Sequence, residues 1–205
     1  MAGRVRSLSA QPSQPVVTTT VGKIRGLTIN TVYTFKGVPY GGSTSGRARF
    51  LPPPRVQPWP GIRDTNALGE RCPQERDAMF RLLPEVERPE TEGEDCLRLN
   101  VWTNGLNASG KRPVMVWLHG GGYATGSGGF IVYDGAELAR KHDVVVVTVN
   151  HRLNVFGFLY LAEIGHADYA QASNAGIRDI VAALEWVRDN IAAFGGDPKN
   201  VTIFG

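Results

Sequence analysis

The sequence predicts an α/β protein, in which strands and helices alternate around a mostly parallel central sheet. Two short apolar runs, Val114–Leu118 and Val144–Val149, lack the alternation of a half-exposed strand and therefore predict strands buried on both faces. After Asn174 the apolar residues recur at helical spacing, and a third apolar run, Val201–Phe204, follows the helix. This order of strands and helix implies right-handed crossovers and a mostly parallel sheet.

The N-terminal part predicts a small antiparallel β-meander. The segments Val16–Thr20, Ile24–Ile29 and Thr31–Val38 are rich in β-branched and aromatic residues, and glycine or asparagine separates them. The Pro-rich passage from Pro52 to Pro60 follows. Because proline cannot donate to a sheet ladder, we expect this passage to run extended over the surface.

Three further segments have weaker patterns. Residues 77–92 carry mixed charges and predict a surface loop with one short helix at Arg76–Leu83. Leu97–Thr103 alternates in polarity and predicts a strand with one polar side, and Gly135–His142 predicts a short helix. No internal repeat or interdomain linker is visible, so we expect residues 16–205 to belong to one domain.

The long helix has clear start and stop signals. Ser173 or Asn174 can cap its first turn, and Gly195–Pro198 ends it. The residues predicted to face the core are Ile177, Ile180, Val181, Leu184, Val187 and Ile191.

Composition and charge exclude several classes of protein. The chain has 205 residues, of which 42% are hydrophobic and 20% charged, as is usual for a globular protein. The net charge of +3 comes from scattered basic residues, so no nucleic-acid partner is predicted. The longest apolar run, Val144–Val149, is far too short to cross a bilayer, so no membrane partner is predicted either. Residues 1–15 lack the apolar core of a signal peptide and are expected to form a disordered tail.

The most informative stretch follows the first buried strand. His119 precedes three glycines, Gly120, Gly121 and Gly122, and Tyr123 comes next. Glycines adopt backbone angles closed to other residues and leave their amides uncovered, so this loop can present N–H groups to a negative charge. It resembles the His-Gly-Gly-Gly motif that forms part of the oxyanion hole in lipases and esterases. A phosphate-binding loop is the alternative, but no nucleotide-binding motif accompanies these glycines.

The chain contains two cysteines, Cys72 and Cys96. Neither lies in a Cys-x-x-Cys motif or beside clustered histidines, so no metal site and no cofactor are predicted. A disulfide between them would contribute roughly 3 kcal/mol on the chain-entropy model. It would also favour an oxidising compartment, whereas the missing signal peptide favours the cytoplasm, and the sequence leaves both open.

Several short motifs occur in a characteristic order across nearly the whole chain after Val16. They are Phe35–Tyr40, Arg49–Pro53, Cys72–Gln74, Glu94–Leu97, His119–Tyr123, Val149–Leu153, Phe156–Leu159, Phe194–Pro198 and Val201–Gly205. In their order and spacing they resemble the N-terminal part of a type-B carboxylesterase, from the cholinesterase-like branch of the α/β-hydrolase fold. The similarity is greatest to bacterial members, for which no membrane anchor is expected.

The resemblance implies a role for each residue of the glycine loop. Gly121 and Gly122 would donate two amides of the oxyanion hole, and the residue after the nucleophile would donate the third. One such donor typically lowers the barrier by roughly 2.7–4 kcal/mol. Gly120 and Tyr123 would contact the substrate, although Tyr123 is equally expected simply to pack on the loop. His119 is expected to support the loop and not to act in catalysis.

The resemblance also implies three structural links. The two cysteines match the first conserved disulfide of the family. Arg49 with Glu94, and Arg152 with Asp179, match two buried ion pairs that hold loops against the sheet. Breaking either pair would leave a buried charge and cost on the order of 3–5 kcal/mol.

The nucleophile elbow of the family, Gly-x-Ser-x-Gly, would begin at Gly205. The serine, and the acid and histidine that follow it in this fold, would therefore lie beyond this residue. No serine of the chain has glycines two residues before and two residues after it; Ser127 fails because Thr125 precedes it. Residues 16–205 are thus expected to be the N-terminal part of a single α/β-hydrolase domain, truncated before the elbow.

Two function hypotheses follow from these observations. In the first, the full-length protein is a carboxylic-ester hydrolase that forms an acyl-enzyme on serine. It would act on small-molecule carboxylic esters, without a cofactor, as a monomer or homodimer, and the 205-residue chain alone would be inactive. In the alternative, the protein is a catalytically inactive cholinesterase-like interaction module. The unaltered glycine loop favours the hydrolase.

Overall fold

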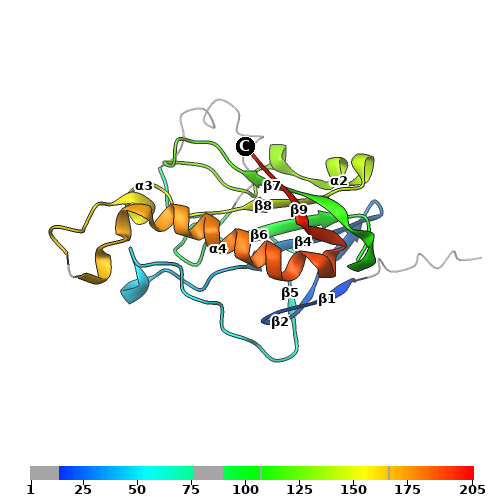
Figure 1. The fold of residues 1–205 in the computed structure, drawn as a ribbon, viewed down its shortest axis with the longest axis horizontal. Coiled ribbons are helices and arrows are strands. Elements are labelled where there is room, and N and C mark those ends of the chain that lie inside the picture. Colours follow the sequence, from blue (N-terminus) through cyan, green and yellow to red (C-terminus); the bar gives the residue numbers. More distant parts are fainter. Residues whose placement is uncertain (1–13, 76–89, 107, 166) are drawn as a thin grey trace, which may run out of the picture.

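Two β-sheets form the framework of the chain, and helices pack on both faces of the larger sheet (Figure 1). The computed structural model describes residues 14–75, 90–106, 108–165 and 167–205. The strands are β1 (Val16–Thr19), β2 (Gly22–Arg25), β3 (Leu27–Ile29), β4 (Val32–Pro39), β5 (Ile62–Asp64), β6 (Arg98–Thr103), β7 (Arg112–Leu118), β8 (Val145–Val149) and β9 (Gly196–Phe204). The α-helices are α2 (Ala136–His142), α3 (Asn154–Phe158) and α4 (Ala175–Asn190).

The larger sheet has the strand order β3-β4-β6-β8-β7-β9, and it is mixed. The pairs β3–β4, β4–β6 and β6–β8 are antiparallel, whereas β7 pairs in parallel with both β8 and β9. The α/β class is confirmed. The expectation of a mostly parallel sheet is wrong for the described residues, because N-terminal strands extend this sheet through β4.

The expected N-terminal meander is divided between two sheets. β1 and β2 form an antiparallel pair in the small sheet, which has the order β1-β2-β5, while β3 and β4 pair in the large one. The single strand expected at Ile24–Ile29 therefore breaks at Gly26. A Cβ on Gly26 would lie 2.5 Å from the carbonyl oxygen of Thr34, so the chain passes too close to its neighbour for any other residue.

β6 and β8 form the buried centre of the large sheet. Alternate residues face opposite sides: Leu99 and Val147 pack in the cluster that includes α4, and Trp102 and Val146 pack in the cluster that includes α2. The run Val144–Val149 is buried throughout, as predicted. The polar side predicted for β6 does not face solvent, because its polar residue Asn100 is buried.

β7 and β9 are less buried than their sequences predicted. In β7, Val114 and Val116 are buried, but Met115 and Trp117 are only half-buried. In the described part of the chain, β9 pairs with β7 alone and forms an edge of the sheet, and Ile203 is 51% exposed. The apolar run Val201–Phe204 also predicts a buried strand, and this prediction is wrong for the described residues, since no further strand lies beside β9 within them.

α4 confirms the predicted long helix and part of its predicted core face, since Val187 and Ile191 are buried and Leu184 packs against the core. Its buried residues are Ala175, Gly176, Asp179, Ala183, Trp186, Val187 and Asn190. Ile177 and Val181, predicted to face the core, are 39% and 50% exposed. The reason is close packing, since a Cβ on Gly176 would lie 2.6 Å from the carbonyl oxygen of Arg152. Only small residues fit at such a contact.

The residues predicted to begin and end the helices have those roles only in part. Asn174 precedes α4 but makes no side-chain capping bond, and a 3₁₀ turn, Ala172–Asn174, leads into the helix instead. Gly195, with φ of 79°, ends the 3₁₀ turn that follows α4. α2 confirms the helix predicted at Gly135–His142. The helix expected at Arg76–Leu83 lies outside the described residues.

Within the described part of the chain, no helix combines the length and apolar character needed to cross a membrane.

Candidate active site

The candidate site lies at one edge of the large sheet, where β7 and β8 end. Leu118, the last residue of β7, is the parallel partner of Val149, the last residue of β8. The segments that follow these strands, beginning at His119 and Asn150, therefore lie side by side. Ligand sites in α/β proteins commonly form at this edge, beyond the carboxyl ends of parallel strands.

The glycine loop has a backbone that its glycines make possible. Gly121 and Gly122 have φ of 117° and 60°. The carbonyl oxygen of Gly121 accepts hydrogen bonds from the amides of Ala124 and Thr125, at 3.0 and 3.2 Å. A Cβ on Gly121 would lie 2.2 Å from the carbonyl oxygen of Thr125, whereas one on Gly122 would have no neighbour within 4 Å. Gly121 is thus required by sterics and Gly122 by its backbone angle.

The amides of Gly120, Gly121 and Gly122 are available to a ligand. All three residues are exposed, and within the described residues their N–H groups donate no hydrogen bond. Uncovered N–H groups at the end of a buried strand can stabilise a negative charge. The arrangement can therefore hold an anionic oxygen.

Two histidine rings stack next to this loop. The rings of His119 and His151 are 4.6 Å apart and nearly parallel, and both side chains are buried. Nδ1 of His119 donates to the carbonyl oxygen of Gly120 at 2.9 Å. Burial, and secondarily the charge of His151, lower the pKa of His119 to about 4, and burial also lowers the pKa of His151. A neutral, buried His119 agrees with its expected role as a support of the loop.

Tyr123 extends from the glycine loop into solvent. Its side chain is 56% exposed, and its ring centroid lies 5.0 Å from that of Phe158 and 6.3 Å from that of His151. Its carbonyl oxygen accepts the amide of Asn154 at 2.7 Å. Tyr123 thus packs against neighbouring rings and also exposes part of its ring to solvent. Its position is compatible with packing on the loop and with contact with a substrate.

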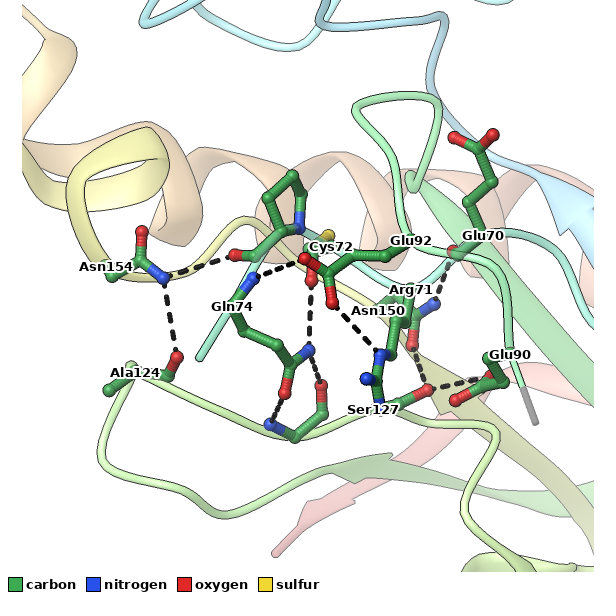
Figure 2. A network of polar contacts seen from close by, with 12 residues as sticks. Glu70, Arg71, Cys72, Gln74, Glu90, Glu92, Ala124, Ser127, Asn150 and Asn154 are labelled. Atoms are coloured by element: carbon green, nitrogen blue, oxygen red, sulfur yellow. Dashed lines mark hydrogen bonds and ion pairs between the residues drawn. The ribbon is translucent and has the colours of Figure 1, made fainter. Parts of the chain in front are cut away.

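Polar side chains hold the segment that follows the glycine loop (Figure 2). The side-chain amide of Gln74 donates to the carbonyl oxygen of Gly126 at 2.8 Å and accepts the amide of Gly126 at 2.7 Å. Nδ2 of Asn154 donates to the carbonyl oxygens of Pro73, at 3.2 Å, and Ala124, at 3.5 Å. The Cys72–Gln74 motif therefore lies directly against the loop.

A second part of this network surrounds Ser127, which is completely buried (Figure 2). Its hydroxyl donates to the carboxylate of Glu90 at 3.0 Å and accepts the amide of Gly129 at 2.9 Å. Oδ1 of Asn150 accepts the amide of Gly128 at 2.7 Å, and its Nδ2 donates to the carbonyl oxygen of Glu70 at 3.2 Å. Sequence reasoning assigned no role to these residues, although Gln74 and Asn150 lie within motifs that it identified.

Two of the three expected structural links are present as predicted. Cys72 and Cys96 form a disulfide, with their Cα atoms 5.0 Å apart. Arg152 and Asp179 form an ion pair at 2.7 Å, and their side chains are 2% and 0% exposed. Burial raises the pKa of Asp179, and the hydrogen bonds from Arg152 oppose that rise.

The third link, between Arg49 and Glu94, forms but is not buried. Nε of Arg49 donates to the carboxylate of Glu94 at 2.8 Å, and the Arg49 side chain is 44% exposed. The expected cost of 3–5 kcal/mol for breaking it is therefore wrong. Solvent screens such a pair, so it contributes little to stability.

Other features of the described residues do not form a second site. They contain no cluster of three His, Cys, Asp or Glu side chains that could hold a metal ion. A groove of about 910 Å³ runs along α4 past Pro52–Pro54, but none of its lining residues belongs to the glycine loop. We therefore take the uncovered glycine amides, which can bind an anionic oxygen, as the candidate site.

Several solved structures that are similar to this chain in fold are esterases. An esterase from the anaerobe Clostridium hathewayi has a TM-score of 0.85 and 46% identity, with 95% of this chain and 39% of that chain covered. A carboxylesterase from Geobacillus stearothermophilus has a TM-score of 0.84 and 45% identity, with 93% of this chain and 37% of that chain covered. Together with the strand order and the glycine loop, these likenesses define the class: the chain has the α/β-hydrolase fold.

Within that class, the model of the carboxylesterase family matches residues 13–205, and the chain belongs to this family. Para-nitrobenzyl esterase of Bacillus subtilis (strain 168) is 44% identical over 190 residues, which are 93% of this chain and 37% of that protein. Acetylcholinesterase of Gallus gallus is 44% identical over 204 residues, which are 95% of this chain and 26% of that protein. The chain thus spans less than two-fifths of the length of these relatives.

Proposed function

We propose that the full-length protein containing this chain is a carboxylic-ester hydrolase, in which Gly121 and Gly122 donate hydrogen bonds to the oxyanion. The observation that carries the proposal is the glycine loop itself, with positive φ angles and uncovered amides at the end of β7. Membership of the carboxylesterase family supports it.

The proposed reaction proceeds through an acyl-enzyme. A serine hydroxyl loses its proton to a histidine and attacks the ester carbonyl carbon, so that the carbonyl oxygen becomes negatively charged. The glycine amides stabilise this oxygen until the C–O bond breaks and the alcohol leaves with the proton. Water then attacks the acyl-serine in the same way and releases the acid. The third amide of the oxyanion hole would come from the residue after the nucleophilic serine.

The position of Gly205 supports the proposed source of the serine. Phe204 at the end of β9 is the parallel partner of Trp117 in β7. A Cβ on Gly205 would lie 2.4 Å from the carbonyl oxygen of Leu118, immediately before the glycine loop. A Gly-x-Ser-x-Gly segment beginning at Gly205 would therefore start at the same edge of the sheet as the oxyanion amides.

The remaining residues of the loop have supporting roles in this proposal. Gly120 keeps the approach to the oxyanion open, since a Cβ there would have no neighbour within 4 Å and the residue itself is exposed. Tyr123, with its exposed face, lines the space that a small-molecule ester would occupy. We propose no cofactor, and a monomer or homodimer as the active form.

Hydrolysis of p-nitrophenyl acetate tests the proposal. We expect activity in the protein expressed from its complete gene, labelling of one serine by a fluorophosphonate, and no activity in residues 1–205 alone. Absence of both activity and labelling in the complete protein would contradict the proposal. It would favour the alternative, a catalytically inactive cholinesterase-like interaction module, and a search for a protein partner.

A further inference from the structure

Gly126 is the residue on which the start of the glycine loop rests. Its φ is 116°, and a Cβ there would lie 2.3 Å from Nδ1 of His119 and 2.5 Å from the carbonyl oxygen of Gly120. No other residue can occupy this position without moving both neighbours. The Gly126 peptide therefore packs directly against His119 and Gly120.

One side chain holds both polar groups of Gly126. The amide of Gly126 donates to Oε1 of Gln74 at 2.7 Å, and Nε2 of Gln74 donates to the carbonyl oxygen of Gly126 at 2.8 Å (Figure 2). Nε2 also donates to the carbonyl oxygen of Cys72 at 3.0 Å. Two antiparallel N–H···O bonds to one residue resemble the pairing of β-strands, and they determine both the position and the orientation of that residue.

Gln74 is itself held by groups outside the glycine loop. The disulfide at Cys72, two residues earlier, joins this segment to Cys96, just before β6. The backbone amide of Gln74 donates to the carboxylate of Glu92 at 3.2 Å. The carbonyl oxygen of Pro73 accepts a hydrogen bond from Asn154 at 3.2 Å. Gln74 therefore links the loop to a segment that the disulfide and Glu92 also hold.

We infer that Gln74 is a positioning residue for the oxyanion hole, and this inference rests on the proposed function. By holding Gly126, it restrains a segment that its glycines would otherwise leave free to adopt many conformations. Oxyanion stabilisation requires donors that already point at the developing charge, because reorientation during the reaction costs free energy. By keeping these donors oriented, Gln74 lowers the free energy of the transition state and has little effect on the binding of the substrate.

The test compares Gln74→Glu and Gln74→Met with the matched control Asn104→Asp, all in the complete protein. Glutamate keeps the shape of Gln74 and can accept the Gly126 amide, but its carboxylate cannot donate to the two carbonyl oxygens. Methionine keeps the length and makes none of these three bonds. Asn104 makes a similar bond, from Nδ2 to the carbonyl oxygen of Ala139 at 2.8 Å. It follows β6 at the opposite edge of the sheet, because β6 and β8 are antiparallel.

We expect kcat for p-nitrophenyl acetate to fall about 10- to 100-fold in both Gln74 variants, with KM changed by less than about two-fold. Affinity for a trifluoromethyl ketone, which forms a tetrahedral oxyanion on the serine, should fall by a similar factor. Amide hydrogen exchange in residues 119–126 should become faster. The Asn104→Asp variant should lose stability and change none of these three quantities.

The outcomes separate the two proposals. An active wild type with unchanged kcat in the Gln74 variants, or with an equal fall in the Asn104→Asp variant, would overturn the inference and leave the proposed function intact. An inactive wild type would overturn the proposed function and the catalytic role of Gln74 with it. Hydrogen exchange would then still decide whether Gln74 restrains the loop.

Discussion

Replacing Asp179 with asparagine should destabilise the protein far more than breaking a surface ion pair would. The carboxylate of Asp179 accepts three hydrogen bonds from Arg152: from its backbone amide at 3.0 Å, from Nε at 2.8 Å and from a terminal nitrogen at 2.7 Å. Asparagine keeps the shape and one acceptor, but it leaves a guanidinium that is 2% exposed without its counter-charge. We expect the free energy of unfolding to fall by about 3–5 kcal/mol.

The other contacts of Arg152 determine where in that range the loss falls. Its guanidinium also donates to the carbonyl oxygen of Leu51 at 2.8 Å and to that of Ala175 at 3.5 Å. These bonds persist in the variant and favour the lower half of the range. Urea denaturation of the complete protein measures the loss from the midpoint and slope. A pH of 8 is suitable, because burial raises the pKa of Asp179.

Two controls make this prediction refutable. Arg49→Ala removes an ion pair whose arginine is 44% exposed, and it should lower the free energy of unfolding far less than Asp179→Asn does. Combining Arg152→Met with Asp179→Leu removes both charges of the pair, and should cost about 2–3 kcal/mol because the Leu51 carbonyl loses its donor and the Arg152 backbone amide loses its acceptor. If Asp179→Asn cost no more than Arg49→Ala, or if the double variant were less stable than the single one, the reasoning would be wrong.

Three more outcomes concern the site and its supports. The pKa of His119 falls from 6.5 to about 4 on burial, so below about pH 6.5 the unfolded chain takes up a proton that the folded chain does not. Stability should therefore decrease by up to about 3 kcal/mol between pH 6.5 and 4, and a pH series of urea midpoints should show a smaller decrease in His119→Gln. Gly121→Ala, whose Cβ would lie 2.2 Å from the Thr125 carbonyl, should lower kcat by about 10²- to 10³-fold. Gly122→Ala, which meets no atom within 4 Å, should lower it less, and the reverse order in esterase assays would contradict the steric argument. Replacing both cysteines of the disulfide with serine should lower the free energy of unfolding by about 3–4 kcal/mol, and an unchanged urea midpoint would show that the unfolded-state argument fails.

The sequence predicted best those elements whose environment is uniform along their length. Val144–Val149 has neighbouring strands on both sides and packed side chains on both faces, so an unbroken apolar run described it correctly. The long helix was equally clear, because its apolar residues recur at helical spacing over its whole length.

Positions that depend on distant neighbours could not be predicted from local patterns. The buried face of α4 consists largely of small residues and Asp179, because the helix lies against the Arg152 backbone and pairs with its side chain. A pattern based on hydrophobicity selected Ile177 and Val181 instead, which are exposed. Likewise, nothing local in Ile24–Ile29 indicates that Gly26 lies against Thr34 of a different strand.

The candidate site shows the same division. The glycine loop is one continuous stretch and was recognisable from its residues alone. Gln74 lies 52 residues before Gly126, and no periodicity or spacing connects the two. Its place within the Cys72–Gln74 motif indicated importance, but only the folded chain reveals the partner. The same holds for Asn150, whose side chain reaches back to the Glu70 backbone.

The position of β8 has a consequence for how the chain folds. β8 lies between β6 and β7, although both precede it in the sequence, so these two cannot complete the sheet until Val145–Val149 inserts between them. Within the described residues, this strand provides the only ladder between the antiparallel and the parallel part of the large sheet. Closing such non-local pairings is slow, because loop entropy is lost before contacts compensate. We therefore expect insertion of β8 to limit the rate of folding, so that substitutions within β8 slow folding as well as weaken the folded state.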